Sequence, residues 1–395
     1  MLNEDFLKML DQKSVIREIF DYGKKRALEI GYENVFDYSL GNPSVEAPME
    51  FNDKLCELSK IPGIHGYSQS LGIVEVRRRV AESLKNRFNI PYEEKHIFMA
   101  TGAAGALAHA MRAVTKPNDK ILTFAPYFPE YIQYVTRTGC KLEIVPANLS
   151  NFQINFSELE RMLDENVMAI LINTPNNPTG AIYEEDTIIR LSKLLNEKQK
   201  EYGHEIYIIS DEPYREIVFD GIKIPYIANY YDNTITCYSF SKSLSLPGER
   251  IGYVAVNPKA YGADYIAAMC AQISRGIGHN CPPSIIQYAI CDFLDKTSDL
   301  SVYEKNMNIL YDELTKLGFE IIRPAGTFYM FPKCLEEDSI KFCNKAKEFD
   351  LLLVPSDSFG VKGYFRIAYC IDTEKVIRSL DAFRRLAEYY KNIND

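Results

Sequence analysis

Residues 167–211 read VMAILINTPNNPTGAIYEEDTIIRLSKLLNEKQKEYGHEIYIISD, and this stretch contains a complete strand–helix–strand unit. Its two ends, Val167–Asn173 and Ile206–Asp211, are apolar runs of strand length, as expected of strands that are covered on both faces. Between them, Glu184–Lys200 has the apolar spacing of an amphipathic helix. Because a helix that connects two strands in this way normally returns the chain to a parallel neighbour, the stretch predicts a mainly parallel sheet with helices on both sides.

Similar apolar runs occur on both sides of this unit, and together they predict seven strands. Five more runs have strand length; they are Ile97–Ala100, Ile121–Ala125, Leu142–Val145, Ile235–Ser239 and Ile251–Val256. A second helical pattern, Phe128–Thr138, lies between two of them. The fold class that we expect is therefore α/β, with a mainly parallel seven-stranded sheet sandwiched by helices in one large domain.

The pattern changes after about residue 285. Helices are predicted for Leu7–Ile30, Tyr303–Leu317 and Val376–Tyr390, and short strands for Phe319–Ile322, Thr327–Phe331, Leu351–Pro355 and Tyr364–Tyr369. We therefore predict that residues 45–285 form the large domain, and that residues 1–44 and 286–395 form a smaller α+β domain. Joining the two ends of the chain in one domain depends largely on the family resemblance described below.

The composition excludes several classes of protein. Of the 395 residues, 46% are hydrophobic and 25% are charged, close to the average of soluble globular proteins. The net charge of -9 disfavours binding to nucleic acid, and no apolar stretch approaches the roughly 18 residues that cross a bilayer. The nine cysteines are scattered without a Cys-x-x-Cys pair, as in reduced cytosolic proteins. We expect a cytoplasmic protein without a membrane or nucleic-acid partner.

No metal site and no dinucleotide-binding loop is predicted. The five histidines are isolated and form no His-Glu-x-x-His motif. Gly276-Ile-Gly278 lacks the third glycine of a dinucleotide loop and does not directly follow a predicted strand.

Polar residues follow several of the predicted strands. Asn173–Gly180 is an amide-rich turn, Asp211 and Tyr214 follow the next strand, and the strand after that leads into Ser239-Phe-Ser-Lys242 and then Arg250. Because ligands bind beyond the carboxyl ends of the strands in sheets of this class, we expect these side chains to line one site.

These segments resemble the class I/II aminotransferases, fold type I enzymes that use pyridoxal 5′-phosphate, and in particular the aspartate aminotransferase type. The resemblance extends from Tyr67 to Arg366, and its most specific segments are NNPTG (176–180), SDEPY (210–214) and SFSKSLSLPGERIGY (239–253). It implies an aminotransferase that moves an amino group between an L-amino acid and a 2-oxo acid by a ping-pong mechanism, in amino acid metabolism.

The resemblance assigns the catalytic residues. Lys242 is the amine that anchors the cofactor covalently and carries a proton. Asp211 keeps the ring nitrogen protonated, because a buried carboxylate favours a cationic neighbour. Tyr214 and Asn177 are implied to hydrogen-bond to O3′ of the ring. Read alone, Lys242 would be a surface lysine and Asp211 a helix N-cap.

Two further groups of residues are implied to hold the cofactor. The backbone amides of Gly102, Ala103 and Ala104 at a helix start, together with Ser239, Ser241 and Arg250, are implied to bind its phosphate. Phe128 is the aromatic residue that covers the ring in this family, although it is also a reasonable core residue; the chain has no Trp.

The substrate residues come from different parts of the chain. By resemblance, Arg366 and Asn177 hold the substrate α-carboxylate, and Gly41 lies in the segment that closes over the site with the small domain. Tyr67 matches the residue that reaches the phosphate of the neighbouring subunit, which implies a homodimer.

The amino donor stays open. Some relatives bind a distal carboxylate with a lysine where this chain has Ala104, and others with an arginine ahead of an Asn-Pro-Pro turn. Here Arg275 precedes Cys281-Pro-Pro283 but is one place off. Arg275 either reads a dicarboxylate substrate or belongs to an interface salt bridge, so aspartate, glutamate and other donors are all compatible with the sequence.

Two other functions are less favoured than transamination. A carbon–sulfur β-lyase on the same fold tends to carry Asp-Glu-Ile-His where this chain has Asp211-Glu-Pro-Tyr214, which favours the aminotransferase. A transcription regulator with a DNA-binding domain before the aminotransferase-like part is disfavoured, because only about 40 residues precede Gly41.

Overall fold

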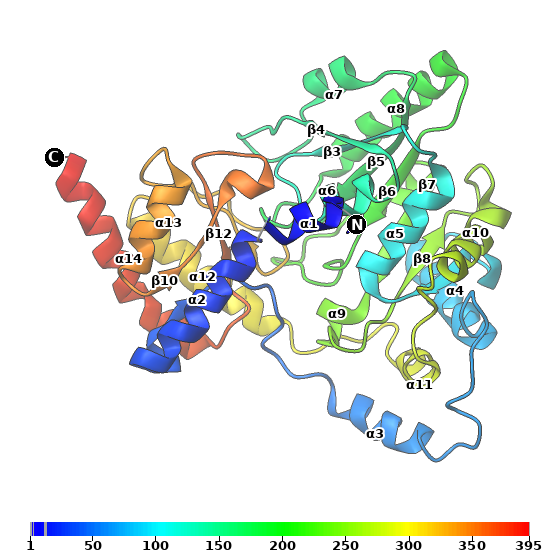
Figure 1. The fold of residues 1–395 in the computed structure, drawn as a ribbon, viewed down its shortest axis with the longest axis horizontal. Coiled ribbons are helices and arrows are strands. Elements are labelled where there is room, and N and C mark those ends of the chain that lie inside the picture. The colour runs from blue at the N-terminus through cyan, green and yellow to red at the C-terminus, as the bar shows by residue number, and fades with distance from the viewer. Residues whose placement is uncertain (1, 3, 12–13, 395) are drawn as a thin grey trace. The chain divides into compact units, whose positions relative to one another are not determined.

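The computed structural model describes residues 2, 4–11 and 14–394, which form two compact units (Figure 1). The sheet unit consists of Val45–Asn177 and Ala181–Leu300, and the terminal unit consists of Met1–Ser44, Pro178–Gly180 and Ser301–Asp395. The sheet unit therefore extends beyond residue 285, the boundary expected from the sequence. The reason is packing, because Ile286, Ala289 and Phe293 are buried in a core cluster of the sheet unit.

The sheet unit is built on one seven-stranded sheet with the order β2-β8-β7-β6-β5-β3-β4. The pairs among β7, β6, β5, β3 and β4 are parallel, whereas β8 is antiparallel to both of its neighbours. The strands are β2 (Ile97–Ala100), β3 (Lys120–Phe124), β4 (Lys141–Val145), β5 (Val167–Asn173), β6 (Tyr207–Asp211), β7 (Thr234–Ser239) and β8 (Gly252–Val256). The predicted α/β class and mainly parallel sheet are confirmed.

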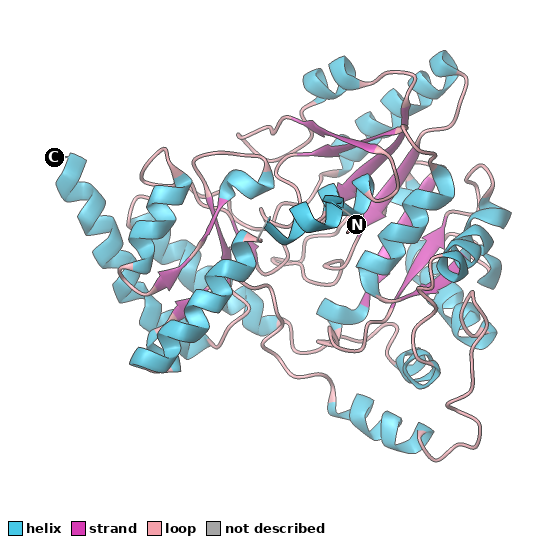
Figure 2. Ribbon diagram, viewed as in Figure 1, coloured by secondary structure: helices cyan, strands magenta, loops and turns pink. Residues whose placement is uncertain are grey.

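The strands are apolar because both faces of the sheet are covered, as Figure 2 shows for the magenta strands. Ile170 and Ile172 of β5 pack in a cluster with Ile188 and Leu191 of α8, while the alternate residue Leu171 is also buried. The helices of this unit are α3 (Met49–Leu58), α4 (Val74–Phe88), α5 (Gly102–Val114), α6 (Tyr131–Thr136), α7 (Phe156–Met162), α8 (Glu185–Tyr202), α9 (Phe240–Ser243), α10 (Ala263–Gly276) and α11 (Ser284–Ala289).

The terminal unit combines long helices with two small sheets. Strand β1 (Phe36–Asp37) pairs in parallel with β10 (Leu351–Leu352), and β11 (Val354–Pro355), β12 (Phe365–Ala368) and β9 (Tyr329–Met330) form an antiparallel sheet. Its helices are α1 (Glu4–Asp11), α2 (Val15–Ile30), α12 (Ser301–Lys316), α13 (Ser339–Lys347) and α14 (Thr373–Asn394).

Two sequence-based expectations for this unit need comment. The helix expected over Leu7–Ile30 appears as α1 and α2, and residues 12–13 of that range lie outside the described residues. The strand predicted for Phe319–Ile322 is wrong, because these residues have no strand structure. Phe319 is instead buried against the rings of Phe342 and Phe365.

Candidate active site

The ends of β5 and β6 are joined by side-chain amides. Asn173 lies opposite Asp211 in the sheet, and its Nδ2 donates to the backbone oxygen of Asp211 over 2.9 Å. Oδ1 of Asn173 accepts a hydrogen bond from the backbone nitrogen of Asn177 over 2.7 Å. The amide-rich turn is thereby fixed to the end of β6, the strand that carries the candidate carboxylate.

Asp211 is a buried carboxylate with one oxygen satisfied and the other unsatisfied. Tyr131 Oη donates to Oδ2 over 2.6 Å, while Oδ1 is buried and has no hydrogen-bond partner among the described residues. Burial raises the pKa of Asp211 to about 7, and the neighbouring Glu212 contributes to this rise while the bond from Tyr131 opposes it. A carboxylate in this state is suited to a cationic donor that is brought in by a ligand.

Two other aromatic residues lie in this part of the sheet unit. Phe128 packs edge to face on Tyr131, with ring centres 5.6 Å apart, and Tyr214 is buried in the turn that follows β6. Tyr131 was not predicted as a site residue, and Asn173 was predicted only as part of the amide-rich turn. Tyr131 contacts a residue 80 positions away in the sequence, and no local pattern indicates such a contact.

The start of α5 and the Arg250 side chain form a second part of the site. Gly102 has a φ of +76°, and a Cβ at this position would lie 2.8 Å from Nη2 of Arg250. Nη2 of Arg250 donates to the backbone oxygen of Thr101 over 3.2 Å. Ala103 and Ala104 follow in the first turn of α5 and are half-buried. Free backbone amides at a helix start together with a guanidinium group can bind an anion such as a phosphate.

Two serines and a lysine follow β7. Ser239 caps α9, because its Oγ accepts from the backbone nitrogen of Ser241 over 3.2 Å, and the two hydroxyl oxygens are 2.8 Å apart. Lys242 lies in α9 and is half-buried. Since β6 and β7 are adjacent and parallel, Asp211 and Lys242 both follow carboxyl ends on the same edge of the sheet.

Tyr67 and Arg275 are exposed, unlike Asp211 and Tyr131. The relative exposure of Tyr67 is 108%, although its neighbour Ser68 is held by Nε2 of Gln287 over 3.2 Å. Arg275 lies in the last turn of α10 and makes no ion pair with another described residue. The contacts that hold Asp211 in the sheet unit do not include Tyr67 or Arg275.

The two candidate substrate residues of the terminal unit lie beside each other. Arg366 on β12 is buried, donates from Nη2 to the backbone oxygen of Ser39 over 2.6 Å, and lies 4.6 Å from the ring centre of Tyr329. A Cβ on Gly41 would overlap the hydroxyl group of the same tyrosine. The segment that contains Gly41 is thus packed directly on the aromatic side chain that covers the arginine.

Comparison with known proteins places this geometry in context. The family model "Aminotransferase class I and II" matches residues 33–383. The chain is 29% identical to aromatic-amino-acid aminotransferase 2 of Thermococcus litoralis, over 99% of this chain and 100% of that protein, and 28% identical to aspartate aminotransferase of Thermotoga maritima, over 91% and 93%. A crystal structure of an aminotransferase from Eubacterium rectale is similar, with 45% identity, a TM-score of 0.96 and 99% coverage of both chains.

Proposed function

Because this chain belongs to the family of class I and II aminotransferases, we propose that the residues at the edge of its sheet hold pyridoxal 5′-phosphate and use it for transamination. The protein is a pyridoxal 5′-phosphate-dependent aminotransferase that moves an amino group between an amino acid and a 2-oxo acid. The lyase alternative is not favoured, because the named relatives are aminotransferases.

The observation that carries the assignment of residues is the unsatisfied Oδ1 of Asp211. When bound, the cofactor supplies an electron-withdrawing ring that allows a proton to leave the substrate Cα. That role requires the ring nitrogen to stay protonated, and Oδ1 of Asp211 is a buried acceptor for its N–H. Tyr131 orients the carboxylate through Oδ2, and Asn173 holds the backbone oxygen of Asp211.

The remaining residues of the sheet unit have complementary roles in this proposal. Lys242 anchors the cofactor and moves the proton, and the hydroxyl group of Tyr214 and the amide of Asn177 donate to O3′. Phe128 covers the ring. The phosphate is bound by the amides of Gly102, Ala103 and Ala104 and by the side chains of Ser239, Ser241 and Arg250, which supply the donors and positive charge that a dianion requires.

For the substrate, we propose that Arg366 binds the α-carboxylate, with Asn177 as a second donor and Gly41 in the covering segment. The guanidinium group of Arg366 lies 4.6 Å and 5.1 Å from the ring centres of Tyr329 and Phe359, and its planar set of N–H donors suits bidentate binding of a carboxylate. Named relatives act on aspartate and on aromatic amino acids, so both donor classes are candidates. Arg275 stays a candidate ligand for a distal carboxylate.

The covalent anchor gives the sharpest test. The Lys242→Ala variant should lose the visible absorption of the bound cofactor and turnover, whereas Lys259→Ala, which changes an exposed lysine after β8, should keep both. An unchanged absorption band in Lys242→Ala would show that another lysine is the anchor. To identify the amino donor, the enzyme loaded with cofactor is mixed with one amino acid at a time, and the change in its visible absorption is measured. Release of ammonia or sulfide would instead support a lyase.

A further inference from the structure

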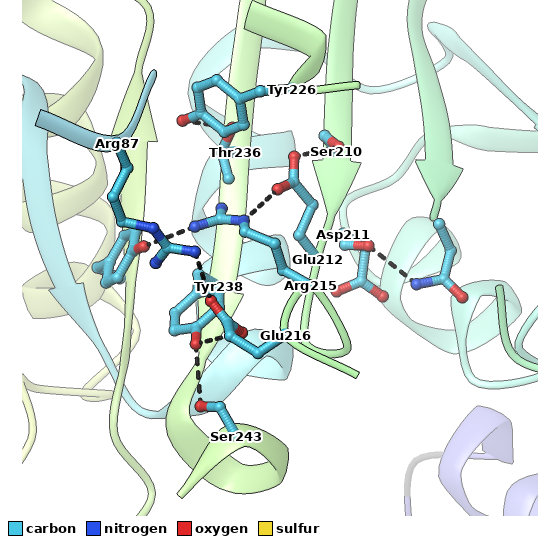
Figure 3. A network of polar contacts seen from close by, with 12 residues as sticks. Arg87, Ser210, Asp211, Glu212, Arg215, Glu216, Tyr226, Thr236, Tyr238 and Ser243 are labelled. Atoms are coloured by element: carbon cyan, nitrogen blue, oxygen red, sulfur yellow. Dashed lines mark hydrogen bonds and ion pairs between the residues drawn. The ribbon is translucent and has the colours of Figure 1, made fainter. Parts of the chain in front are cut away.

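A partly buried network of charged and hydroxyl groups is built around the turn that follows Asp211 and is not used by the site described above. We call it the tether network and define it by Arg87, Glu212, Arg215, Glu216, Tyr238 and Ser243 (Figure 3). The backbone nitrogen of Glu212 donates to the oxygen of Cys237 over 2.9 Å, so the chain stays extended beyond Asp211. Because side chains alternate along an extended chain, Asp211 and Glu212 point to opposite faces of the sheet.

The centre of the tether network is an ion pair between Glu212 and Arg215. Nε of Arg215 lies 2.7 Å from Oε2 of Glu212, and the two side chains are only 4% and 5% exposed. Ser210 Oγ donates to the other carboxylate oxygen over 2.7 Å. The guanidinium group lies 4.6 Å from the ring centre of Tyr238, and its Nη1 donates to Tyr253 Oη over 3.2 Å. This pair fixes the turn after β6 against the aromatic side chains of β7 and β8.

Glu216 connects the same turn to the segment that carries the lysine. Its Oε1 lies 3.0 Å from Nη2 of Arg87, and its Oε2 accepts a hydrogen bond from Tyr238 Oη over 2.7 Å. Tyr238 Oη is also hydrogen-bonded to Ser243 Oγ over 2.9 Å. Ser243 is the residue after Lys242 and the last residue of α9. One phenol therefore links the turn after Asp211 to the helix of Lys242.

This arrangement contributes more to geometry than to stability. The Glu212–Arg215 pair is buried, and buried ion pairs are weak sources of stability but can specify one structure. Helix α9 has only four residues, too few to be rigid by its own backbone hydrogen bonds. Its position therefore depends on side-chain contacts such as that between Ser243 and Tyr238.

We propose that Tyr238 is a positioning residue, which holds Lys242 at a fixed place relative to Asp211 through its hydrogen bonds to Ser243 and Glu216. The proposal rests on the function proposed above for Lys242 and Asp211. It predicts that loss of the phenolic hydroxyl group displaces the lysine without removing any group that touches the cofactor or the substrate.

Two variants test the proposal from the two ends of the link. Tyr238→Phe keeps the ring beside Arg215 and removes the hydroxyl group, and Ser243→Ala removes the partner at the lysine end. The matched control is Tyr92→Phe, because Tyr92 is also buried and its hydroxyl group bonds to Tyr226 over 2.9 Å in the same aromatic cluster. Each variant is loaded with pyridoxal 5′-phosphate and measured for kcat, KM, melting temperature and circular dichroism of the visible cofactor band.

In Tyr238→Phe and in Ser243→Ala we expect kcat to fall about tenfold, because small displacements of a catalytic group cost rate, while KM for the amino donor stays within about twofold. The dichroism of the cofactor band should weaken in both, since it reports how the cofactor is held. The double variant should resemble the single variants, because both break one link. Tyr92→Phe should keep the wild-type kcat and dichroism.

The proposal is overturned if Tyr238→Phe matches Tyr92→Phe in kcat and dichroism, or if Ser243→Ala keeps wild-type values for both. If Tyr238→Phe does not fold, Ser243→Ala decides alone. The Lys242→Ala spectrum tests the proposed function separately, because a cofactor band that persists in this variant refutes Lys242 as the anchor. If that band is lost but the Tyr238 and Ser243 variants behave like the wild type, only the positioning role of Tyr238 is refuted.

Discussion

At the residue scale, Asp211 combines a buried position with one unsatisfied oxygen. Without a cation beside it, burial favours the protonated carboxyl group and raises its pKa to about 7. A protonated ring nitrogen at Oδ1 would reverse that preference by forming a charged pair. The ionised form of Asp211 is therefore unfavourable in the folded chain alone and favourable when the cofactor is bound.

This leads to a prediction for the cofactor-free protein. The pKa of an aspartate in an unfolded chain is about 3.9, whereas the pKa of folded Asp211 is about 7. Its contribution to stability is therefore complete below about pH 4 and is lost as the pH rises towards 7, by on the order of 4 kcal/mol. Asp211→Asn cannot lose this contribution. Urea unfolding at a series of pH values should show the wild type losing more stability than the variant over this range; parallel curves would contradict the assignment.

At the element scale, the start of α5 is shaped by a glycine. Gly102 has a positive φ, and its Cα faces Arg250 so closely that a methyl group has no room. Backbone amides can approach an anion only where no side chain intervenes. The beginning of this helix is thus built for close approach of a ligand to the backbone.

The Gly102→Ala substitution should weaken cofactor binding about tenfold and lower the free energy of unfolding by about 1–3 kcal/mol, because alanine is strained at positive φ. Gly248→Ala is the matched control, since a Cβ there meets nothing within 4 Å and Gly248 belongs to the same loop as Arg250. Titration of the cofactor-free variants with pyridoxal 5′-phosphate gives both affinities. Equal binding by the two variants would remove Gly102 from the phosphate site.

The central sheet was predictable because its strands are apolar on both faces. The runs Ile97–Ala100 and Val167–Asn173 coincide with β2 and β5. The prediction for Phe319–Ile322 was wrong for a physical reason. Phe319 is buried among aromatic rings, and a short apolar run that is buried in a loop looks the same in the sequence as a buried strand.

The site was predictable only where it follows the strands. Lys242, Asp211 and Asn177 come directly after apolar runs, so their order in the chain indicates a common edge. Tyr131 and the tether network were not found, because they depend on pairings such as Arg87 with Glu216, 129 positions apart. Neither propensity nor periodicity carries information about contacts of this range.

At the scale of the whole molecule, we propose that Tyr67 reaches the site of a second subunit in a homodimer. Tyr67 is fully exposed, while Gln287, which donates to the next residue Ser68, is fully buried and accepts from the backbone nitrogen of Ile73 over 2.9 Å. A tyrosine held outward on a fixed segment can complete a site on another subunit. In a dimer with two-fold symmetry, each subunit would give and receive one such tyrosine.

Mixing two damaged chains tests this arrangement. Tyr67→Ala and Lys242→Ala subunits, when unfolded and refolded together, should form hybrids in which one site receives intact Lys242 from one chain and intact Tyr67 from the other. Random pairing would restore about a quarter of the wild-type sites, seen as turnover above that of either variant alone. Turnover that only averages the two variants would show that Tyr67 acts within its own chain.

The reversed direction of β8 has a consequence for how the chain supplies its charges. Because β8 is antiparallel to β7 and Gly252 pairs with Ser239, β8 begins at the rim where β7 ends. The connection of residues 240–251, which includes α9, therefore delivers both an amine and a guanidinium group at one rim, whereas a parallel strand would begin at the opposite rim. An insertion or deletion between Lys242 and Arg250 would therefore change the distance between those two cations along the rim.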